Sequence, residues 1–436
     1  MIRRLDTATM GVDGVVRALD RAAAAVDPAI HRQVDEILAA VRERGDAALV
    51  DFTERFDHVR LEPADFRVTD AAIDAAERLV GPATVAALTY AAGRIEAFHR
   101  EAKPRSWSMT DAAGSRLGQD VRPLDRVGVY VPGGRAAYPS TVLMTAVPAR
   151  VAGVSEIVLV SPPARDRSLP PAVLMAARLA GVTEIYRVGG AHAIGALAYG
   201  TATIRRVDKI VGPGNVYVTL AKGRVFGEVG IDMLAGPSEV LVVADESADP
   251  VCAAADLLAQ AEHDPMARAV LLTPSAALAA RVAVETERQL AELPRREIAG
   301  PALAAHGAVV VTASLDEALE IVNRLAPEHL ELLVADPEGL LPRIRHAGAV
   351  FLGPTTPEVV GDYVAGPDHV LPTGGTARFA SALSTEDFVK RLSVIRYSPE
   401  GLREAWPHLA ELARVEGLHG HGAAARVRIA GRGGTT

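Results

Sequence analysis

The stretch RVGVYVPGGRAAYPSTVLMTAVPARVAGVSEIVLV, residues 126–160, decides the fold class. It starts with a short apolar, β-prone run, continues through a glycine loop and a helical segment, and ends in a second β-prone run. Short strands that alternate with helices are typical of a parallel sheet with helices on its faces. The stretch therefore predicts an α/β domain.

The same alternation extends over most of the chain that follows. The runs EIYRV at 184–188 and VDKIV at 207–211 continue the first series. A second series comes after Gly236, with β-prone runs at 239–245, 268–273, 307–312, 330–335 and 348–353. The expected fold class is α/β, with two doubly wound, incompletely Rossmann-like parallel-sheet domains.

The two ends of the chain have other patterns. Up to about residue 120 the apolar positions recur at helical spacing, as in RQVDEILAAVRERGDAALVDFTERF at 32–56. The chain ends in HGHGAAARVRIAGRGGTT, which is too short and too glycine-rich to make a core. As a free tail this end would be disordered, and as an arm it would dock on a neighbour.

Composition narrows the class of protein. Of the 436 residues, 49% are apolar and 23% are charged, which is typical of a globular protein. The net charge of −8 argues against a nucleic-acid surface, and small molecules are the expected partners. The N-terminus lacks the apolar core of a signal peptide, and no apolar run is long enough to cross a bilayer. We therefore expect a cytoplasmic protein without a membrane segment.

Cys252 is the only cysteine and lies in an apolar, helical stretch. A single cysteine excludes both a disulfide framework and a thiolate metal site within the chain. We expect its side chain to be a small, buried apolar group.

Glycine follows three of the β-prone runs, in VGVYVPGG, YRVGGAHAIG and KIVGPGNVY. The carboxyl ends of parallel strands share one edge of a sheet, where helix N-termini offer unpaired N–H groups to a ligand. A phosphate-bearing cofactor and simple tight turns both explain these loops. None of them is a G-x-G-x-x-G fingerprint, and the near match at Gly420, Gly422 and Ala425 has no preceding strand.

The segment AQAEHDPMA, residues 259–267, holds a candidate metal half-site. The apolar run before it predicts a helix that reaches about His263 and is stopped by Pro265. Gln260 and His263 are then i and i+3 on one face, within reach of one bound atom. Imidazole is a common zinc ligand, whereas an amide oxygen is an unusual one. The alternative is that His263 interacts with the carbonyl end of the helix and Gln260 is solvated.

Eight blocks, taken together, resemble histidinol dehydrogenase. In chain order they are VYVPGGRAAYPSTVLM, VGGAHAIGALAYGT, DKIVGPGNVYV, IDMLAGPSEVLVVAD, DLLAQAEHD, APEHLEL, GDYVAGPDHVLPT and EGLHGH. The resemblance covers nearly the entire chain, and the order, spacing and rarity of the blocks make it specific. It implies an enzyme that oxidises L-histidinol through L-histidinaldehyde to L-histidine with two NAD+ and one zinc ion per site, the final stage of histidine biosynthesis.

The zinc ligands that the resemblance implies are Gln260, His263, Asp362 and His421, the last two in GDY and EGLHGH. Without the resemblance, Asp362 would be interpreted as a turn residue and His421 as a solvated histidine of the tail. The family's substrate contributes further ligands to the metal, so that zinc orients the substrate and does not take part in redox chemistry.

The substrate contacts implied by the resemblance are Ser238, Gln260, His263, His329, Asp362, Glu416 and His421. His369 is a candidate for a supporting role around the metal. Asp368 stands where Asn is more familiar in the family, and we expect it to add negative charge near the site.

The acid–base pair of the family matches Glu328 and His329 in APEHLEL. Plain capping at a helix-to-strand junction is the alternative for these two residues. Oxidation of an alcohol needs a base for the hydroxyl proton, and oxidation of an aldehyde needs a base that activates water. We assign the first step to His329 and the second to Glu328.

The NAD contacts of the family match Tyr130 and Asn215, and a third position, usually Gln, is His192 here. Histidine cannot present the paired donor and acceptor groups of a carboxamide. The sequence therefore leaves open how His192 affects the affinity for NAD.

The resemblance also implies a division into domains and a homodimer. Residues 1–24 form an N-terminal helical segment, and residues 25–125 form the helical part of a first α/β domain that 238–383 completes. Residues 126–237 form the NAD-binding α/β domain. Residues 384–436 form an arm that contributes to the site of the neighbouring subunit.

Three other functions agree with parts of the pattern. A dehydrogenase of another polyol, such as a sulfonated propanediol, would share the fold, but Glu416 and His421 favour a substrate with an amine and an imidazole. A zinc hydrolase would use Glu328 to activate water without a dinucleotide, and the glycine loops and Tyr130 weigh against it. A non-catalytic binding protein would have little reason to keep both bases and all four ligand positions.

Overall fold

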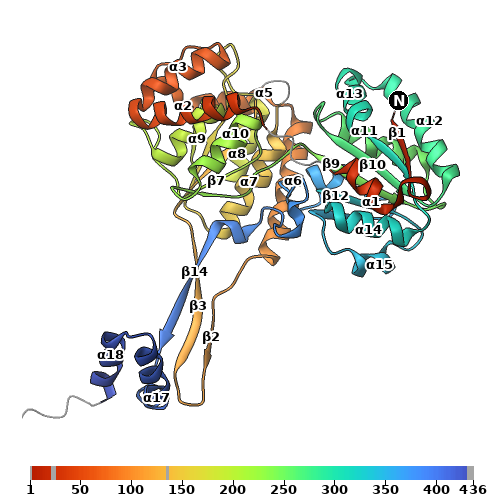
Figure 1. Cartoon of the computed structure of the whole chain (residues 1–436). Helices are drawn as coiled ribbons and strands as arrows, with labels where there is room; N and C mark the ends of the chain where they lie inside the picture. Colours follow the sequence, from red (N-terminus) through yellow and green to blue (C-terminus); the bar gives the residue numbers. More distant parts are fainter. Residues whose placement is uncertain (1, 21–25, 134–136, 430–436) are drawn as a thin grey trace, which may run out of the picture. The chain divides into compact units, whose positions relative to one another are not determined.

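The computed structural model describes residues 2–20, 26–133 and 137–429. The chain divides into two compact units (Figure 1). The first comprises Met1–Ala102 and Leu124–Phe388, and the second comprises Lys103–Pro123 and Val389–Thr436. Each unit has its own sheet structure.

The first unit contains a six-stranded parallel sheet. Its strand order is β1 (Arg3–Asp6), β11 (Ala308–Val311), β10 (Arg268–Thr273), β9 (Glu239–Ala244), β12 (His329–Leu333) and β13 (Ala349–Leu352). Successive side chains of each strand point to opposite faces of the sheet, and helices pack on both faces. One face is covered by α11 (Pro250–Ala261), α12 (Ala276–Glu292) and α13 (Arg296–His306), the other by α1 (Thr7–Leu19) and α14 (Leu315–Leu325). The five strands predicted after Gly236 are thus confirmed, and β1 was missed because RRLD is short and mostly charged.

The same unit contains a five-stranded parallel sheet. Its strand order is β6 (Glu184–Tyr186), β5 (Glu156–Val160), β4 (Arg126–Tyr130), β7 (Lys209–Val211) and β8 (Gly230–Ile231). Its connecting helices are α7 (Pro139–Ala152), α8 (Pro171–Ala180), α9 (Gly190–Tyr199) and α10 (Val216–Val225). The predicted α/β class with two parallel sheets is therefore confirmed.

The early helices pack on the five-stranded sheet. Helices α2 (Pro28–Arg44) and α3 (Asp46–Asp57) share a core with α9 and α10, while α5 (Asp70–Leu79) and α6 (Pro82–Glu101) contact α7 and α8; the short α4 (Pro63–Phe66) follows α3. This corrects the assignment of 25–125 to the domain completed by 238–383. Helical periodicity identifies which face of a helix is buried, but not the sheet against which it is buried.

The second unit is an antiparallel sheet with two helices. Strands β2 (Trp107–Thr110), β3 (Arg116–Pro123) and β14 (Val389–Arg396) pair in the order β14-β3-β2, and α17 (Pro399–Val415) and α18 (His419–Ile429) follow. The second unit thus joins 103–123, expected in an α/β domain, to most of the segment 384–436 that is expected to form the arm. No local pattern shows that β3 pairs with a strand so far along the chain.

The remaining elements are short. They are α15 (Pro337–Leu340), α16 (Val359–Tyr363) and the 3-10 helices η1 (Leu341–Arg343), η2 (Thr376–Arg378) and η3 (Thr385–Phe388). In the described ranges no helix is both long and apolar enough to cross a membrane. Cys252 is exposed, contrary to the expected burial, because it lies on the outer side of the first turn of α11.

Candidate active site

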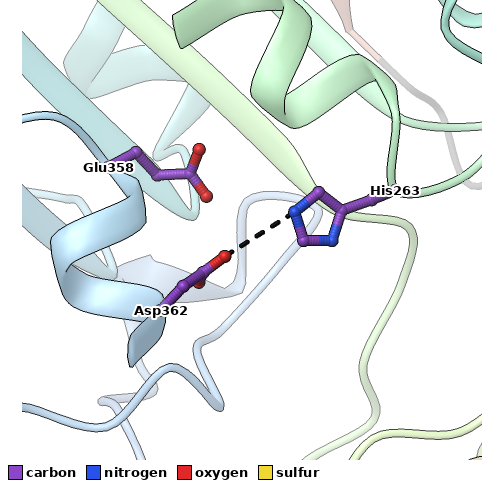
Figure 2. Close-up of side chains that lie close together, drawn as sticks. All are labelled: His263, Glu358 and Asp362. Carbon is purple, nitrogen blue, oxygen red and sulfur yellow. Dashed lines mark ion pairs between the residues drawn. The ribbon is translucent and has the colours of Figure 1, made fainter. Parts of the chain in front are cut away.

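Three potential metal ligands meet beside α11 and α16. Figure 2 shows that His263 lies just beyond α11, and that Glu358 and Asp362 lie one turn apart at α16. Nε2 of His263 is 3.6 Å from Oδ2 of Asp362, and the candidate ligand atoms of all three residues lie within 4.8 Å of one another. Imidazole nitrogen and carboxylate oxygen are common zinc ligands, so this donor set fits that ion.

The negative charges of the two carboxyl groups in this cluster are poorly balanced by nearby positive charge. Burial raises the pKa of Asp362 to about 6 and raises the pKa of Glu358 well above its ordinary value. Their nearest basic neighbours are imidazoles: His263 beside Asp362, and Nε2 of His329 at 3.7 Å from Oε1 of Glu358. Buried carboxylates are stable as anions only with a cation nearby, and a divalent ion would provide one.

Gln260 lies directly behind the cluster and is fully buried. In the amide orientation that satisfies its neighbours, its nitrogen donates to both carboxylate oxygens of Glu358, at 3.1 and 3.2 Å. Its oxygen accepts from the backbone N–H of Glu239 at 3.1 Å. Glu358 therefore fixes the orientation of the amide, and the alternative of a solvated Gln260 is wrong.

Glu328 and His329 are held by the first residue of β9. The backbone N–H of Glu239 donates to Oε2 of Glu328 at 2.8 Å, and Nδ1 of His329 lies 3.0 Å from the Glu239 carbonyl. A carbonyl only accepts, so Nδ1 carries the proton and Nε2 of neutral His329 is left as a base. The side chain of Glu239 is itself paired with Arg268 in the interior.

Burial shifts the pKa of both candidate bases. It lowers the pKa of His329 to about 3, which keeps the ring neutral at neutral pH. It raises the pKa of Glu328 well above its ordinary value; the hydrogen bond from the Glu239 N–H opposes this rise, and the charges of Glu239 and Glu358 add to it. Positive charge brought into the site would lower this pKa and favour the anionic, basic form of Glu328.

His369 and Asp368 support the site from the next loop. Nδ1 of His369 lies 2.9 Å from the backbone oxygen of Asp362, and Nε2 lies 3.4 Å from the Thr141 hydroxyl on α7. Oδ1 of Asp368 accepts from the Val370 N–H at 2.8 Å. Burial raises the pKa of Asp368 well above its usual value. The extra negative charge expected at position 368 stays a prediction.

The glycine loops follow β4, β6 and β7, at one edge of the five-stranded sheet. Gly212 has a φ of 111°, and a Cβ there would lie 2.3 Å from the Tyr130 carbonyl oxygen. Tyr130 is buried, and its hydroxyl accepts from the Gly190 N–H at 3.2 Å. Asn215 caps α10 by accepting from the N–H groups of Tyr217 and Val218. Residues 134–136 of the first loop lie outside the described ranges.

His192 is buried on α9, beneath an aromatic pair. Its ring contacts Phe52 and Phe56, and its Nε2 lies 3.4 Å from the Thr53 hydroxyl. Burial lowers the pKa of His192 to about 3. The residue therefore packs between α9 and α3 as a neutral ring, and a contact with a cofactor stays a prediction.

The other predicted substrate residues lie in different parts of the chain. Ser238 is half-buried and directly precedes β9. Glu416 ends α17 and His421 lies in the first turn of α18, and both are exposed in the second compact unit. The first unit therefore brings together Gln260, His263 and Asp362 of the four predicted zinc ligands, with Glu328 and His329.

Glu358 and Glu239 were not predicted from the sequence. Glu358 precedes Asp362 by four residues in PEVVGDY, the spacing that places two side chains on one helical face. That spacing could have identified Glu358, although α16 is only one turn long. Glu239 carries no such signal, because its role depends on the pairing of β9 with β12.

Comparisons with known proteins give the family of the chain. The family model described as histidinol dehydrogenase matches residues 19–429. The chain is 55% identical over 404 residues to the histidinol dehydrogenase of Synechococcus sp., covering 92% of this chain and 93% of the relative. It is 57% identical over 399 residues to that of Moorella thermoacetica, covering 92% and 94%.

A solved structure shows the same fold. The crystal structure of histidinol dehydrogenase from Elizabethkingia anophelis matches with a TM-score of 0.93 at 37% identity, covering 98% of each chain. The family model spans nearly all of the sequence, and the relatives are matched over almost their full length. The chain therefore belongs to the histidinol dehydrogenase family.

Proposed function

We propose that this chain oxidises L-histidinol through L-histidinaldehyde to L-histidine, with two NAD+ as oxidant and one zinc ion per site, in the cytoplasm. One observation carries the proposal beyond family membership. The free Nε2 of His329 faces Glu358 at 3.7 Å, so a general base lies next to the potential metal ligands. A substrate held by that cluster would present its alcohol to the base.

The proposed zinc ligands are Gln260, His263, Asp362 and His421. The side chain of His263 is 40% exposed, so an ion and a substrate can reach it. Glu358 holds the amide of Gln260 and adds negative charge beside the ion. When bound, zinc would orient the imidazole and amine of the substrate, because it has no redox chemistry of its own.

The two oxidations need two proton transfers, which we divide between neighbouring residues. His329 accepts the hydroxyl proton of histidinol at Nε2, since Nδ1 is committed to the Glu239 carbonyl. Glu328 takes a proton from the water that attacks the aldehyde carbon. Its Oε2 is anchored by the Glu239 N–H, which fixes the direction of the carboxylate. Keeping both steps in one site retains the reactive aldehyde.

NAD+ would bind at the glycine loops of the five-stranded sheet. The proposed contacts are Tyr130, His192 and Asn215. Burial raises the pKa of Tyr130 to about 12, so its hydroxyl remains a hydrogen-bond donor at all working pH values. Loops at the carboxyl edge of a parallel sheet and the start of α10 provide backbone N–H groups for the pyrophosphate.

We also propose a homodimer in which Glu416 and His421 complete the site of the neighbouring subunit, with Ser238 as a further substrate contact. Large apolar side chains of α17 and α18 support a covered surface: Leu412, Val415 and Val427 are more than 60% exposed. Exposed apolar surface of this kind is typical of an interface.

The first experiment compares substrates and removes the metal. NADH formation with histidinol should exceed that with propanediol sulfonate, and chelation should abolish it while the circular dichroism spectrum stays unchanged. The fold should survive because the proposed ligands join segments of an already large core. Faster turnover of propanediol sulfonate would mean that histidinol is not the preferred substrate. Unfolding on chelation would mean that the metal is needed for the fold.

The second experiment tests the shared site. His329→Asn and His421→Asn, each inactive alone, are refolded together in equal amounts. Random pairing makes about half of the dimers mixed, and each mixed dimer holds one intact site, so roughly a quarter of wild-type activity should return. No return of activity, with mixed dimers shown by mass spectrometry, would place each arm in its own subunit.

A further inference from the structure

The side chain of Glu239 bonds two backbone segments of the proposed site. Its Oε1 accepts from the N–H of Glu328 at 3.3 Å and from the N–H of Gly374 at 3.1 Å. Glu328 directly precedes β12, and Gly374 lies in the loop before η2. One carboxylate oxygen therefore joins the start of β9 to the start of β12 and to this loop.

The other carboxylate oxygen of Glu239 is paired with Arg268, the first residue of β10. Nη1 of Arg268 donates to the carbonyl of Leu19 at 2.5 Å. Both side chains of the pair belong to residues that are buried, with 1% of Glu239 and 5% of Arg268 exposed. Arg268 thus balances the charge of Glu239 and leaves Oε1 to the two N–H groups.

The loop that holds Gly374 is also tied to the segment before β9. The N–H of Gly236 donates to the hydroxyl oxygen of Thr373 at 2.5 Å. Together with the bond from Gly374 to Glu239, this fixes the loop at two points. Ser238, the proposed substrate contact, lies between Gly236 and Glu239 in the sequence. The side chain of Glu239 therefore holds one of the two points that flank Ser238.

A comparable ion pair lies at the amino edge of the five-stranded sheet. Arg126 is the first residue of β4 and Glu184 is the first residue of β6, and their side chains are 7% and 12% exposed. The carboxylate of Glu184 accepts from the side chains of Arg126 and Tyr186 at 2.8 and 2.7 Å. The glycine loops lie at the other edge of this sheet. This pair is therefore a matched reference for a buried pair that is remote from any proposed chemistry.

We propose that Glu239, held in place by Arg268, is a positioning residue for the two bases. This inference rests on the proposed function of Glu328 and His329. The backbone of Glu239 bonds the side chains of both bases, and its side chain bonds the backbone of Glu328. The residue therefore fixes both the chain that carries the bases and the direction in which they point. A misplacement of about 1 Å can lower a catalytic rate about 100-fold.

Two double variants separate the hydrogen bonds from the ion pair. Glu239→Gln combined with Arg268→Met removes both charges but keeps a side-chain oxygen that can accept from the two N–H groups. Glu239→Met combined with Arg268→Met removes the charges and the acceptor. We expect kcat for histidinol to stay within about threefold of wild type in the first variant and to fall about 10- to 100-fold in the second. The KM for NAD+ should not change in either, because the glycine loops belong to the other sheet.

The pair of Arg126 and Glu184 supplies the control for lost stability. Arg126→Met combined with Glu184→Met removes a buried ion pair without touching the proposed site, so kcat should stay at the wild-type value. A change in melting temperature shared by this variant and the methionine pair at 239 and 268 reports the loss of the ion pair alone. If that methionine pair does not fold, Glu239→Asp keeps the charge but shortens the reach of the carboxylate, and about a tenfold loss of kcat is expected.

Amide hydrogen exchange gives a readout that does not depend on turnover. The N–H groups of Glu328 and Gly374 lose their acceptor in Glu239→Met with Arg268→Met and keep one in Glu239→Gln with Arg268→Met. Peptides that contain these two residues should therefore exchange faster in the first variant than in the second. Mass spectrometry of the full-length protein measures the difference.

The outcomes separate this inference from the proposed function. Equal kcat and equal exchange in the two double variants at 239 and 268 would overturn the positioning role and leave the proposed function intact. An equal loss of kcat in the control at Arg126 and Glu184 would show that any buried ion pair has this effect, which also overturns it. A wild-type protein that does not oxidise histidinol would overturn the proposed function, and this inference with it.

Discussion

The two parallel sheets place functional groups at opposite ends of their strands. In the five-stranded sheet, the glycine loops follow the carboxyl ends of β4, β6 and β7. In the six-stranded sheet, Glu328, His329 and Glu239 lie at the amino ends of β12 and β9. The first edge offers backbone N–H groups for a ligand, whereas the second offers side chains that the starts of strands hold in place.

The two edges also differ in how buried charge is balanced. Beside the Gly212 loop, Lys222 and Asp232 form a buried ion pair, and Lys222 donates to the Gly212 carbonyl while Asp232 accepts from the Gly212 N–H. Around Gln260, by contrast, the basic groups paired with Asp362 and Glu358 are the imidazoles of His263 and His329. An ion pair whose charges balance stabilises a loop by itself, whereas buried acids without a positive partner are stabilised when a cation binds.

The largest effect should come from removing a base at the amino edge. Glu328→Gln keeps the acceptor for the Glu239 N–H but cannot activate water, so oxidation of supplied histidinaldehyde should fall about 10²- to 10⁴-fold. Reduction of the same aldehyde by NADH should persist, because that direction needs no attacking water. His329→Asn should instead slow the alcohol step. Stopped-flow measurement of each half-reaction checks this, and equal losses in all of them would contradict the division of roles.

The balanced pair at the carboxyl edge should matter most for stability. Lys222→Met leaves Asp232 charged and buried, and the free energy of unfolding should fall by about 3–5 kcal/mol. Lys209→Met is the matched control, since Lys209 bonds Asp387 at 3.0 Å in a partly exposed position. We expect it to lose about 1 kcal/mol or less in urea unfolding. Equal losses would show that burial of the pair is unimportant.

Replacing the buried acid Asp362 by a neutral residue should stabilise the metal-free protein, whereas Lys222→Met should destabilise it. The folded pKa of Asp362 is about 6 against an ordinary 3.8, so the folded chain binds the extra proton and stability falls as pH rises between these values. Asn cannot ionise and avoids this loss. The gain in unfolding free energy for metal-free Asp362→Asn should be about 1 kcal/mol larger at pH 7.5 than at pH 5. A gain independent of pH would contradict the buried anion.

The smallest effect concerns His192. His192→Gln restores the donor and acceptor of a carboxamide, and one added hydrogen bond should lower the KM for NAD+ by about fivefold with kcat unchanged. His99→Gln is the control, because His99 is a buried histidine of α6, remote from the glycine loops in sequence. An unchanged KM in His192→Gln would mean that residue 192 acts only in packing beneath Phe52 and Phe56.

Much of the molecule was predictable from local patterns. The β-prone runs that predicted two parallel sheets match β4 to β7 and β9 to β13, and the runs of glycine fall at the strand ends where we expected them. The EHD block marked His263 as a candidate ligand, whereas Asp362 and the pair Glu328 and His329 were implied by the resemblance to the family. Periodicity and turn residues are local properties, so the sequence carries them directly.

Only the tertiary structure decided which segments meet. It paired β1 with β11 and β3 with β14, and it placed the early helices on the five-stranded sheet. It also joined Glu331 to the backbone of Glu358. These contacts link residues far apart in the sequence, and a buried polar side chain has the same local pattern whichever partner it finds. The free energy of burying it, and therefore its pKa and its role, is fixed only when the partner is in place.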